Sequence, residues 1–389
     1  MEQQVKRMLD VSFSETMRIS KLATKMEEEG KDVISLAVGE PDFDTPEFIV
    51  KAAEEAMETG FTHYTPSQGI TELREVVAEK VSNENGLKFG KDNVLITPTK
   101  QALFMSVMAH LDDGAEAIIP DPAWVSYAPM VKFADGITRR VPVKENDGFE
   151  LNADEVAEEI TSRTEMIILN SPCNPTGMTM SKEELKGVRD LAIDNDLLVV
   201  SDEVYEKLIF EGEHVSIGSL DGMRERTITV NGFSKAYAMT GWRLGWLVCN
   251  QDLLENIAKI QTHSITCATS FAQKAGLTAL QEKEKGEEAI KQMLETYKKR
   301  REVIVNRLNE IEGFHCPKPN STFYTFPRYD FDKSSMEMAM HLLENAQVAT
   351  TPGAAFGDQG EKHLRISFAN SLDNIKEALD RIETAVQKL

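Results

Sequence analysis

Short runs of β-branched and aliphatic residues alternate with segments of helical periodicity between about residues 94 and 250, and this alternation restricts the fold more than any other feature of the sequence. The runs are, in chain order, Val94–Thr97, Ala117–Pro120, Met166–Leu169, Leu197–Ser201, Thr227–Val230 and Gly245–Val248. Strands separated by helices indicate a largely parallel sheet covered by helices, so we predict an α/β fold. Ligands of such sheets bind beside the carboxyl ends of the strands, and functional residues are expected at the turns there.

The chain is long enough for more than one lobe. At 389 residues it exceeds the usual size of a single compact core, so about two or three lobes are expected. A long helical pattern from about Lys283 to Ile311 precedes two further strand-like runs, Phe323–Phe326 and Leu364–Ser367. These elements predict a second α/β lobe, and a cleft can form between the lobes.

Charge and composition exclude several classes of partner. The formal net charge of −21 at pH 7 would repel nucleic-acid backbones and anionic lipid surfaces. The longest apolar runs are strand-sized, far shorter than the ~20 residues of a membrane helix. The N-terminus lacks the apolar segment of a secretory signal, and the four cysteines have no paired spacing. We therefore predict a cytoplasmic protein with no nucleic-acid or membrane partner, no disulfide framework and no metal site.

A lysine lies shortly after one of the predicted strands. Residues 232–245 read Gly-Phe-Ser-Lys-Ala-Tyr-Ala-Met-Thr-Gly-Trp-Arg-Leu-Gly and follow the run Thr227–Val230. A lysine amine is nucleophilic only when it is neutral, and desolvation together with a nearby cation such as Arg243 would favour the neutral form of Lys235. Such a lysine suits Schiff-base chemistry. Taken alone, Lys235 is better explained as a surface lysine beside a helix start.

Two polar motifs follow the two preceding strands of the pattern. Residues 170–177 read Asn-Ser-Pro-Cys-Asn-Pro-Thr-Gly, and residues 201–205 read Ser-Asp-Glu-Val-Tyr. Asp202 and Tyr205 are three residues apart, so a strand end that turns into a helix can aim both side chains at one ligand. Taken alone, Asn174 is explained by a turn and Asp202 by a helix cap.

Together, the three segments resemble, in the same chain order, the motifs of class I aminotransferases of fold type I. The resemblance extends from about Ser14 to the C-terminus and is closest to the prokaryotic aspartate and aromatic aminotransferases. It implies a large domain over residues 46–285, with a mainly parallel seven-stranded sheet flanked by helices. It also implies a smaller α/β domain built from both chain ends, residues 1–45 and 286–389, and pyridoxal 5′-phosphate as the cofactor.

The resemblance assigns roles toward this cofactor. Lys235 would hold it covalently and move the proton during the reaction, and Asp202 would pair with its protonated ring nitrogen. Asn174 and Tyr205 would hydrogen-bond its phenolate oxygen, and Trp124 would stack on its ring. The residues implied to bind its phosphate are Thr99, Lys100, Ser234, Arg243 and, from the neighbouring subunit, Tyr64. The resemblance therefore implies a homodimer with composite active sites.

The substrates implied by the resemblance are an amino acid and a 2-oxo acid. Arg365 would clamp the substrate α-carboxylate by a two-pronged hydrogen-bonded pair, and Gly39 would approach the same carboxylate with its backbone. Further substrate contacts are implied for Trp124, Asn174, Lys100, Ser14 and Thr16. The last three match positions that meet the side-chain carboxylate in aspartate-using relatives, which favours aspartate as the amino donor.

Two segments depart from the family pattern. Pro98 and Thr99 stand where relatives usually carry glycine or another small residue, and this change concerns the phosphate loop. Ser321 and Thr322, within Asn320–Tyr324, replace a common glycine and alanine in the wall on the substrate side. Both departures bear on specificity more than on reaction type.

We predict transfer of the amino group of aspartate to 2-oxoglutarate, giving oxaloacetate and glutamate, by a ping-pong cycle. An aromatic amino acid or prephenate aminotransferase is the first alternative. The second is a pyridoxal-phosphate-dependent lyase, which would share the lysine, the aspartate and the arginine. A dehydrogenase is disfavoured because no G-x-G-x-x-G segment follows an early strand. A cofactor-sensing regulator is also disfavoured, because such proteins carry a basic DNA-binding domain that the acidic N-terminus does not match.

Overall fold

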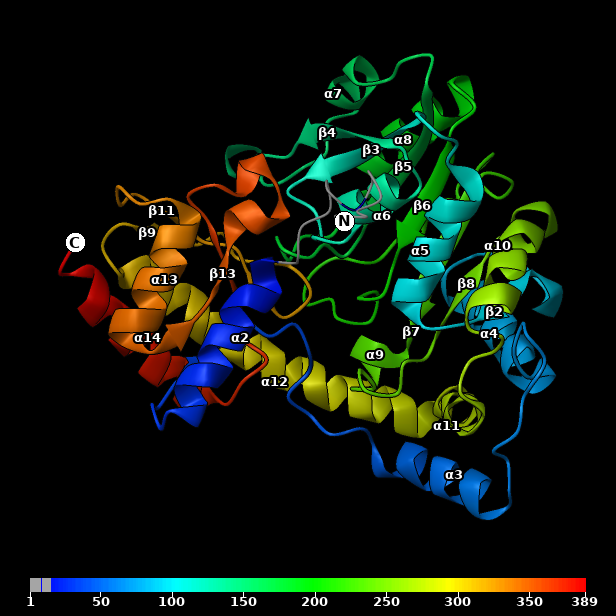
Figure 1. Cartoon of the computed structure of the whole chain (residues 1–389), viewed down its shortest axis with the longest axis horizontal. Helices are drawn as coiled ribbons and strands as arrows, with labels where there is room; N and C mark the ends of the chain where they lie inside the picture. The colour runs from blue at the N-terminus through cyan, green and yellow to red at the C-terminus, as the bar shows by residue number, and fades with distance from the viewer. Residues whose placement is uncertain (1–7, 9–14) are drawn as a thin grey trace, which may run out of the picture.

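The computed structural model describes residue 8 and residues 15–389, and a seven-stranded sheet lies at its centre (Figure 1). Its strands are β2 (Val94–Ile96), β3 (Glu116–Asp121), β4 (Ile137–Pro142), β5 (Thr164–Asn170), β6 (Leu198–Asp202), β7 (Thr227–Gly232) and β8 (Gly245–Val248). Their order is β2-β8-β7-β6-β5-β3-β4, and all are parallel except β8, which is antiparallel to both neighbours. The predicted α/β fold with a mainly parallel sheet is confirmed.

Helices cover both faces of this sheet. They are α5 (Thr99–His110), α6 (Tyr127–Phe133), α7 (Ala153–Glu158), α8 (Lys182–Asp194) and α10 (Gln251–Ser264). Met166 and Ile168 of β5 pack in one cluster with α5, α6 and α10. Ile167 and Leu169 point to the other face, where they pack with α7 and α8. Because successive strand residues alternate between faces, a strand that is buried on both sides has a continuous apolar sequence.

Strand β4 is the strand of this sheet that the sequence analysis did not predict. It lies at the edge, where it pairs only with β3. Ile137 is exposed, and Arg139 and Arg140 are half-buried and form ion pairs with Glu116 and Asp121 of β3. An edge strand that is open to solvent on one side does not need a continuous apolar run, so the periodic signal is missing.

The rest of the described chain forms further helices and short strands. The helices are α2 (Glu15–Glu28), α3 (Glu47–Glu58), α4 (Thr71–Glu84), α9 (Phe233–Ala236), α11 (Ser270–Gln281), α12 (Lys283–Glu310), α13 (Ser335–Ala346) and α14 (Leu372–Val386). The strands are β1 (Ile34–Ser35), β9 (Phe314–His315), β10 (Tyr324–Thr325), β11 (Arg328–Tyr329), β12 (Val348–Ala349), β13 (Thr351–Pro352) and β14 (Leu364–Ser367). The predicted long helix is α12 and the predicted strand 364–367 is β14, whereas the strand predicted over 323–326 is shortened to β10.

Segments from the two halves of the sequence lie side by side in the smaller group of elements. Strand β1 pairs in parallel with β12, and α2 packs against β12, β13 and α13, at the left of Figure 1. The division into a large domain over residues 46–285 and a small domain built from both chain ends remains a prediction. Within the described part of the chain, no helix combines the length and the apolar character that crossing a membrane requires.

The parallel strands bring the sequence motifs to one edge of the sheet. Strand β5 ends at Asn170, β6 ends at Asp202, and β7 ends at Gly232, directly before the short helix α9 that carries Lys235. Because β5, β6 and β7 are parallel neighbours, their carboxyl ends meet at the same edge. The three motifs therefore surround one place in the structure.

Candidate active site

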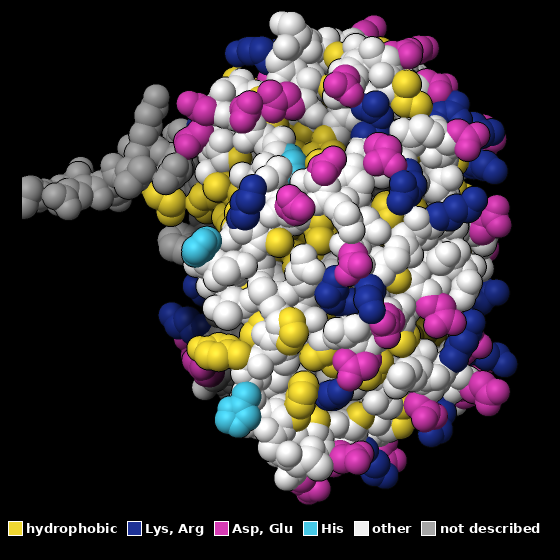
Figure 2. Space-filling model, turned by 90° about the vertical axis from the view of Figure 1, so that its right-hand side faces the viewer, with side chains coloured by type: hydrophobic (Ala, Val, Ile, Leu, Met, Phe, Trp, Pro, Cys, Tyr) yellow, Lys and Arg dark blue, Asp and Glu magenta, His cyan; other side chains and the backbone are white. Residues whose placement is uncertain are grey.

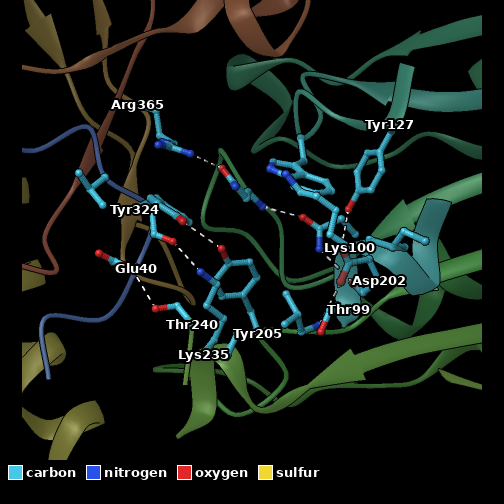
Figure 3. A pocket seen from close by; sticks show the side chains of 18 of the residues that line it. Glu40, Thr99, Lys100, Tyr127, Asp202, Tyr205, Lys235, Thr240, Tyr324 and Arg365 are labelled. Atoms are coloured by element: carbon cyan, nitrogen blue, oxygen red, sulfur yellow. Dashed lines mark hydrogen bonds between the residues drawn. The ribbon is translucent and has the colours of Figure 1, made fainter. Parts of the chain in front are cut away.

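A cavity of about 430 Å³ opens at this edge of the sheet (Figure 3). The predicted site residues that line it are Gly39, Thr99, Lys100, Trp124, Asn174, Asp202, Tyr205, Ser234, Lys235, Arg243 and Arg365. Lining residues that the sequence analysis did not assign to the site are Glu40, Tyr127, Thr240 and Tyr324. The cavity is thus built from the N-terminal part, the central sheet and the C-terminal part of the chain.

Lys235 reaches into the cavity from α9. Its amine donates a 2.5 Å hydrogen bond to the backbone oxygen of Gly39, and Nζ lies 5.8 Å from the ring centre of Tyr205. Burial lowers the pKa of Lys235 to about 8. This value already includes the carboxylates of Glu40 and Asp202, which oppose the decrease, and the guanidinium groups of Arg365 and Arg243, which add to it. A share of the amine is therefore neutral near pH 7, which a nucleophile or a base requires.

Asp202 lies at the closed end of the cavity and is only 4% exposed. Its Oδ2 accepts a 2.7 Å hydrogen bond from the phenol of Tyr127, and its Oδ1 accepts one of 3.3 Å from the backbone N–H of Val204. Burial raises the pKa of Asp202 to about 6, and these two donors oppose that rise. The carboxylate is thus held in one orientation, and a cationic partner would favour its ionised form.

Arg365 enters the cavity from β14, opposite Asp202. Its Nη1 donates to Oδ1 of Asn174 at 3.1 Å, and its Nη2 donates to the backbone oxygen of Ala37 at 2.6 Å and to Oγ1 of Thr351 at 3.3 Å. Its Nε is buried without a hydrogen-bond partner among the described residues. Since an unpaired buried donor is costly, the guanidinium has binding capacity for an acceptor such as a carboxylate.

Tyr324 was missed by the sequence analysis although it lies between two assigned residues. Its hydroxyl lies 2.9 Å from that of Tyr205, and its ring centre is 4.6 Å from the guanidinium carbon of Arg365. It also limits which residue can stand at position 39 of the neighbouring loop, because a Cβ on Gly39 would lie 2.6 Å from the Tyr324 hydroxyl. A glycine at position 39 therefore lets the backbone approach the cavity.

The start of α5 provides a site suited to an anion. Thr99 is the first residue of this helix, the first turn has no acidic residue, and Oγ1 of Thr99 donates to the backbone oxygen of Asn231 at 3.2 Å. A Cβ on either Gly232 or Gly245 would lie 2.3 Å from Oγ1 of Thr99, so these glycines make room for the threonine side chain. The cation of Arg243 lines the same region. Free backbone N–H groups at a helix N-terminus and a nearby cation favour phosphate binding.

Lys100 follows in the same turn of α5. Its Nζ lies 4.7 Å from the ring centre of Trp124, so the charge of Lys100 faces the aromatic ring in the cavity wall. Burial, together with the nearby Arg243, lowers the pKa of Lys100. The lysine is therefore placed to meet an anionic group beside the tryptophan ring.

The departure at residues 321–322 connects two loops of the site. Both the backbone N–H and the hydroxyl of Ser321 donate to the backbone oxygen of Gly177, at 2.9 and 2.7 Å, and the N–H of Thr322 donates to the backbone oxygen of Leu208 at 2.7 Å. Thr322 has a φ of 61°, a left-handed conformation that strains a β-branched residue. The segment thereby ties together the loops that carry Asn174 and Tyr205.

Three predicted site residues are not brought into the cavity by the described structure. Tyr64 is 89% exposed and lies beside a surface groove that includes Ile265 and Phe271. Ser14 lies outside the described residues. Thr16 belongs to α2, but its side chain is outside the described part of the structure. Their predicted roles remain predictions.

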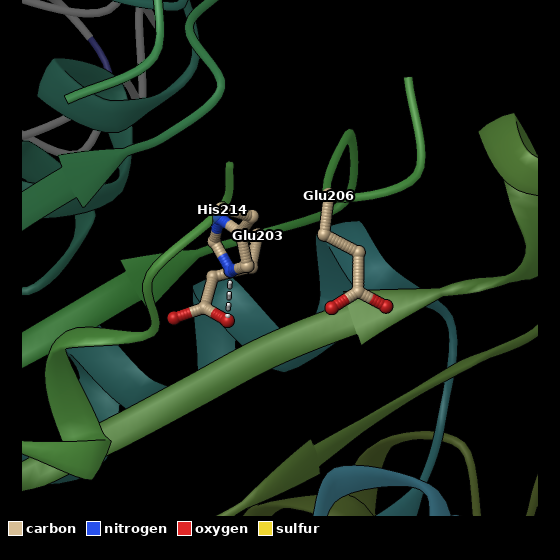
Figure 4. A group of neighbouring side chains, drawn as sticks. All are labelled: Glu203, Glu206 and His214. Atoms are coloured by element: carbon tan, nitrogen blue, oxygen red, sulfur yellow. Dashed lines mark hydrogen bonds and ion pairs between the residues drawn. The ribbon is translucent and has the colours of Figure 1, made fainter. Parts of the chain in front are cut away.

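A buried charged cluster lies behind the turn that carries Asp202 and Tyr205 (Figure 4). Glu203 accepts hydrogen bonds from Nε2 of His214 at 2.9 Å and from the hydroxyls of Ser201 and Ser216 at 2.9 and 2.7 Å. Glu206 pairs with Lys80. Ligand atoms of Glu203, Glu206 and His214 lie within 4.8 Å of one another, a spacing that a metal site would need. Lys80 pairs with Glu206, and His214 and the two serines hold Glu203, so these contacts anchor the turn.

Comparisons with known proteins agree with this geometry. The family model described as "Aminotransferase class I and II" matches residues 31–382. An aspartate aminotransferase of Pyrococcus abyssi is 44% identical over 97% of both chains, and aromatic-amino-acid aminotransferase 2 of Thermococcus litoralis is 43% identical over 97% of both. The solved structure of the Thermus thermophilus aspartate aminotransferase with maleate superposes with a TM-score of 0.95 at 38% identity, covering 99% of this chain and 100% of that one.

Proposed function

The chain belongs to the class I and II aminotransferases, and on that premise we propose that it transfers the amino group of aspartate to 2-oxoglutarate, using pyridoxal 5′-phosphate held on Lys235. The observation that carries the proposal is the placement of Lys235 between a buried carboxylate, Asp202, and a buried guanidinium, Arg365, in one cavity. This arrangement offers a separate partner for a cationic ring, for an aldehyde and for a substrate carboxylate.

The residues present fit this cofactor. Asp202 is a buried acceptor whose ionised form a protonated ring nitrogen would favour. Trp124 supplies an aromatic face, and the start of α5 supplies the N–H groups and hydroxyl that phosphate binds. Asn174 and Tyr205 supply polar groups for the phenolate oxygen. The residues proposed for the phosphate are Thr99, Lys100, Ser234 and Arg243. When bound, pyridoxal phosphate supplies an aldehyde that condenses with amines and a ring that withdraws electrons from the substrate α-carbon.

In the proposed mechanism, Lys235 first holds the cofactor and then acts as base and acid. With a pKa of about 8, its amine is readily deprotonated, so it would take the proton from the substrate α-carbon and deliver it to the cofactor carbon that had carried the aldehyde. The hydrogen bond from Tyr127 orients the carboxylate of Asp202, which would pair with the protonated ring nitrogen. Arg365 binds the α-carboxylate and thereby orients the α-hydrogen toward Lys235.

Preference for aspartate is proposed from Lys100. Its ammonium lies in the cavity wall beside Trp124, where it can pair with a second carboxylate of the substrate. An aromatic amino donor is the second candidate, because the relative from Thermococcus litoralis is an aromatic-amino-acid aminotransferase at nearly the same identity and the cavity wall contains Trp124 and Tyr324.

A cytoplasmic homodimer is part of the proposal. Tyr64 is almost fully exposed beside a surface groove, on the side of the molecule where α4, α10 and α11 lie in Figure 1. Figure 2 shows this side, with hydrophobic side chains exposed in patches among the charged ones. We propose that a second copy covers these patches and that the Tyr64 hydroxyl of each chain contributes to the phosphate site of the other.

A panel of amino donors assayed against 2-oxoglutarate tests the proposed function. We expect aspartate to be used with the highest kcat/KM and oxaloacetate to be the product. Continued formation of a 2-oxo acid without any 2-oxo acid acceptor, beyond one equivalent per active site, would identify a lyase instead. Tyrosine or phenylalanine as the best donor would replace the aspartate assignment with the aromatic one.

A further inference from the structure

Asp121 connects the central sheet to the loop that leads to Arg365. It is the last residue of β3 and is 3% exposed. Its Oδ2 accepts a 3.0 Å hydrogen bond from the backbone N–H of Asp358, and its Oδ1 accepts one of 3.3 Å from that of Gln359. These two amides open the short 3₁₀ helix Asp358–Gly360, which directly precedes β14. One carboxylate therefore holds two backbone groups of a segment more than 230 residues away.

The loop is shaped for this contact. A Cβ on Gly357 would lie 1.8 Å from Oδ1 of Asp121, so any larger residue there would displace the carboxylate. A second link lies beside it, because the N–H of Ala123 donates to the backbone oxygen of Phe356 at 2.9 Å. Arg140 stands at the rim, with Nη1 3.7 Å from Oδ2 of Asp121 and 3.4 Å from the same Phe356 oxygen. No atom of Asp121 lines the active-site cavity.

Both connected segments carry a residue of the proposed site. Trp124 follows Asp121 by three residues, and Arg365 follows the 3₁₀ helix by five. We propose that Asp121 is a positioning residue that locks the Trp124 loop to the Arg365 strand and so sets the distance between the cofactor ring and the bound α-carboxylate. This inference rests on the roles proposed above for Trp124 and Arg365.

The contact between Asp121 and the 358–359 backbone is called the lock below. Its loss is expected to have a different effect from the loss of a cofactor ligand. Arg365 binds the carboxylate that every amino acid and 2-oxo acid substrate shares, so loss of the lock weakens all substrates alike. The proposed ligands of the cofactor ring and phosphate other than Trp124 lie on other elements, chiefly β6, α5 and α9, and are expected to keep their geometry. A defect in substrate binding with intact cofactor binding is therefore the signature of the lock.

The test compares Asp121→Asn with wild type as cofactor-loaded enzyme. The amide keeps the size of the side chain but directs N–H groups toward one of the two backbone donors. We expect KM to rise about tenfold or more for both the amino donor and 2-oxoglutarate, while the dissociation constant of pyridoxal phosphate stays within about twofold of wild type. Gly357→Ala, which displaces the carboxylate from the other side, is expected to show the same split.

Asp113→Asn is the matched control, because Asp113 is an exposed aspartate that precedes β3 at its opposite end. It removes the same charge and should leave both constants unchanged. The inference is overturned if Asp121→Asn and Gly357→Ala keep wild-type KM values, or if either loses cofactor affinity in parallel with substrate affinity. A wild-type enzyme that fails to transaminate any amino acid would instead reject the proposed function.

Discussion

The phenol of Tyr127 donates a 2.7 Å hydrogen bond to Oδ2 of Asp202, joining the first residue of α6 to the last residue of β6. Burial raises the pKa of Tyr127 well above its ordinary value, so the phenol stays protonated and remains a donor. The ring of Tyr127 also meets that of Trp124 edge to face, with centres 5.2 Å apart. One buried side chain therefore orients two residues proposed to contact the cofactor.

Tyr127→Phe is expected to weaken cofactor binding. A hydrogen bond to a charged group is worth roughly 1.5–3 kcal/mol, so the dissociation constant of pyridoxal phosphate should rise about ten- to a hundredfold. The phenol opposes the effect of burial on Asp202, and its loss should raise the pKa of this carboxyl above its present value of about 6. The decrease in affinity should therefore be larger at pH 6 than at pH 8. Equal affinity of variant and wild type at both pH values would contradict the role of Tyr127.

Lys235 is expected to be the single point of covalent attachment of the cofactor. Reduction of the loaded enzyme with borohydride should label the peptide that contains Lys235, and Lys235→Ala should take up no label. Because only the neutral amine attacks the aldehyde, the rate of attachment should rise with pH and level off above about 8, the pKa of this lysine. A label on another lysine, or a rate independent of pH between 6 and 9, would refute the assignment.

Lys100→Ala is expected to change donor preference. A charge-assisted contact is worth roughly 1.5–3 kcal/mol, so kcat/KM for aspartate should fall about ten- to a hundredfold if the contact persists in the transition state. Tyrosine and phenylalanine lack the second carboxylate and should be affected much less. Lys100→Arg, which keeps the charge, is the matched comparison. Equal losses for both classes of donor would assign Lys100 to the cofactor alone.

Tyr64 is expected to act in the active site of a second chain. Sedimentation should give the mass of two chains, and Tyr64→Phe should weaken cofactor binding although Tyr64 lies outside the cavity of its own chain. Mixing Lys235→Ala chains with Tyr64→Phe chains should then restore part of the affinity and activity, because one of the two hybrid sites receives both intact groups. A fully active monomer would exclude composite sites.

Glu206 is expected to stabilise the protein in a pH-dependent way. Burial by itself raises its pKa, but Lys80 and His214 outweigh burial and hold the pKa at about 2, below the ordinary 4.5. Its contribution to stability is therefore present above about pH 4.5 and is lost as the pH falls toward 2. Glu206→Gln removes the buried carboxylate partner of Lys80, leaves the ammonium with the longer 3.6 Å ion pair to Glu84, and should lower the free energy of unfolding by about 3 kcal/mol near pH 7. Urea unfolding between pH 3 and 7 measures both effects.

The double variant Lys80→Met/Glu206→Gln is the control for this pair. It removes both charges and should recover much of the stability lost in Glu206→Gln, since the cost comes from a buried ammonium that has lost its buried carboxylate partner. If Glu206→Gln were as stable as wild type at neutral pH and also at pH 4, the cluster would have no anchoring role.

The central sheet was predictable because most of its strands are buried on both faces. Burial of alternating residues against two layers of helices requires continuous apolar runs, such as Met166–Leu169, and these are visible in the sequence. Strand β4 was not predictable in this way, because an edge strand that carries Arg139 and Arg140 has no such run. The lysine, aspartate and asparagine of the site were found because each follows a strand end, and parallel strands end at one edge.

The sequence by itself determined the α/β class, the strand ends at which Asn174, Asp202 and Lys235 lie, and the chemistry that those residue types allow. Only the tertiary structure decided which residues orient them. Tyr127 reaches Asp202 across 75 positions of the chain, and Asp121 reaches Gln359 across 238. Such contacts are set by the packing of elements that are remote in sequence, and local periodicity carries no information about them.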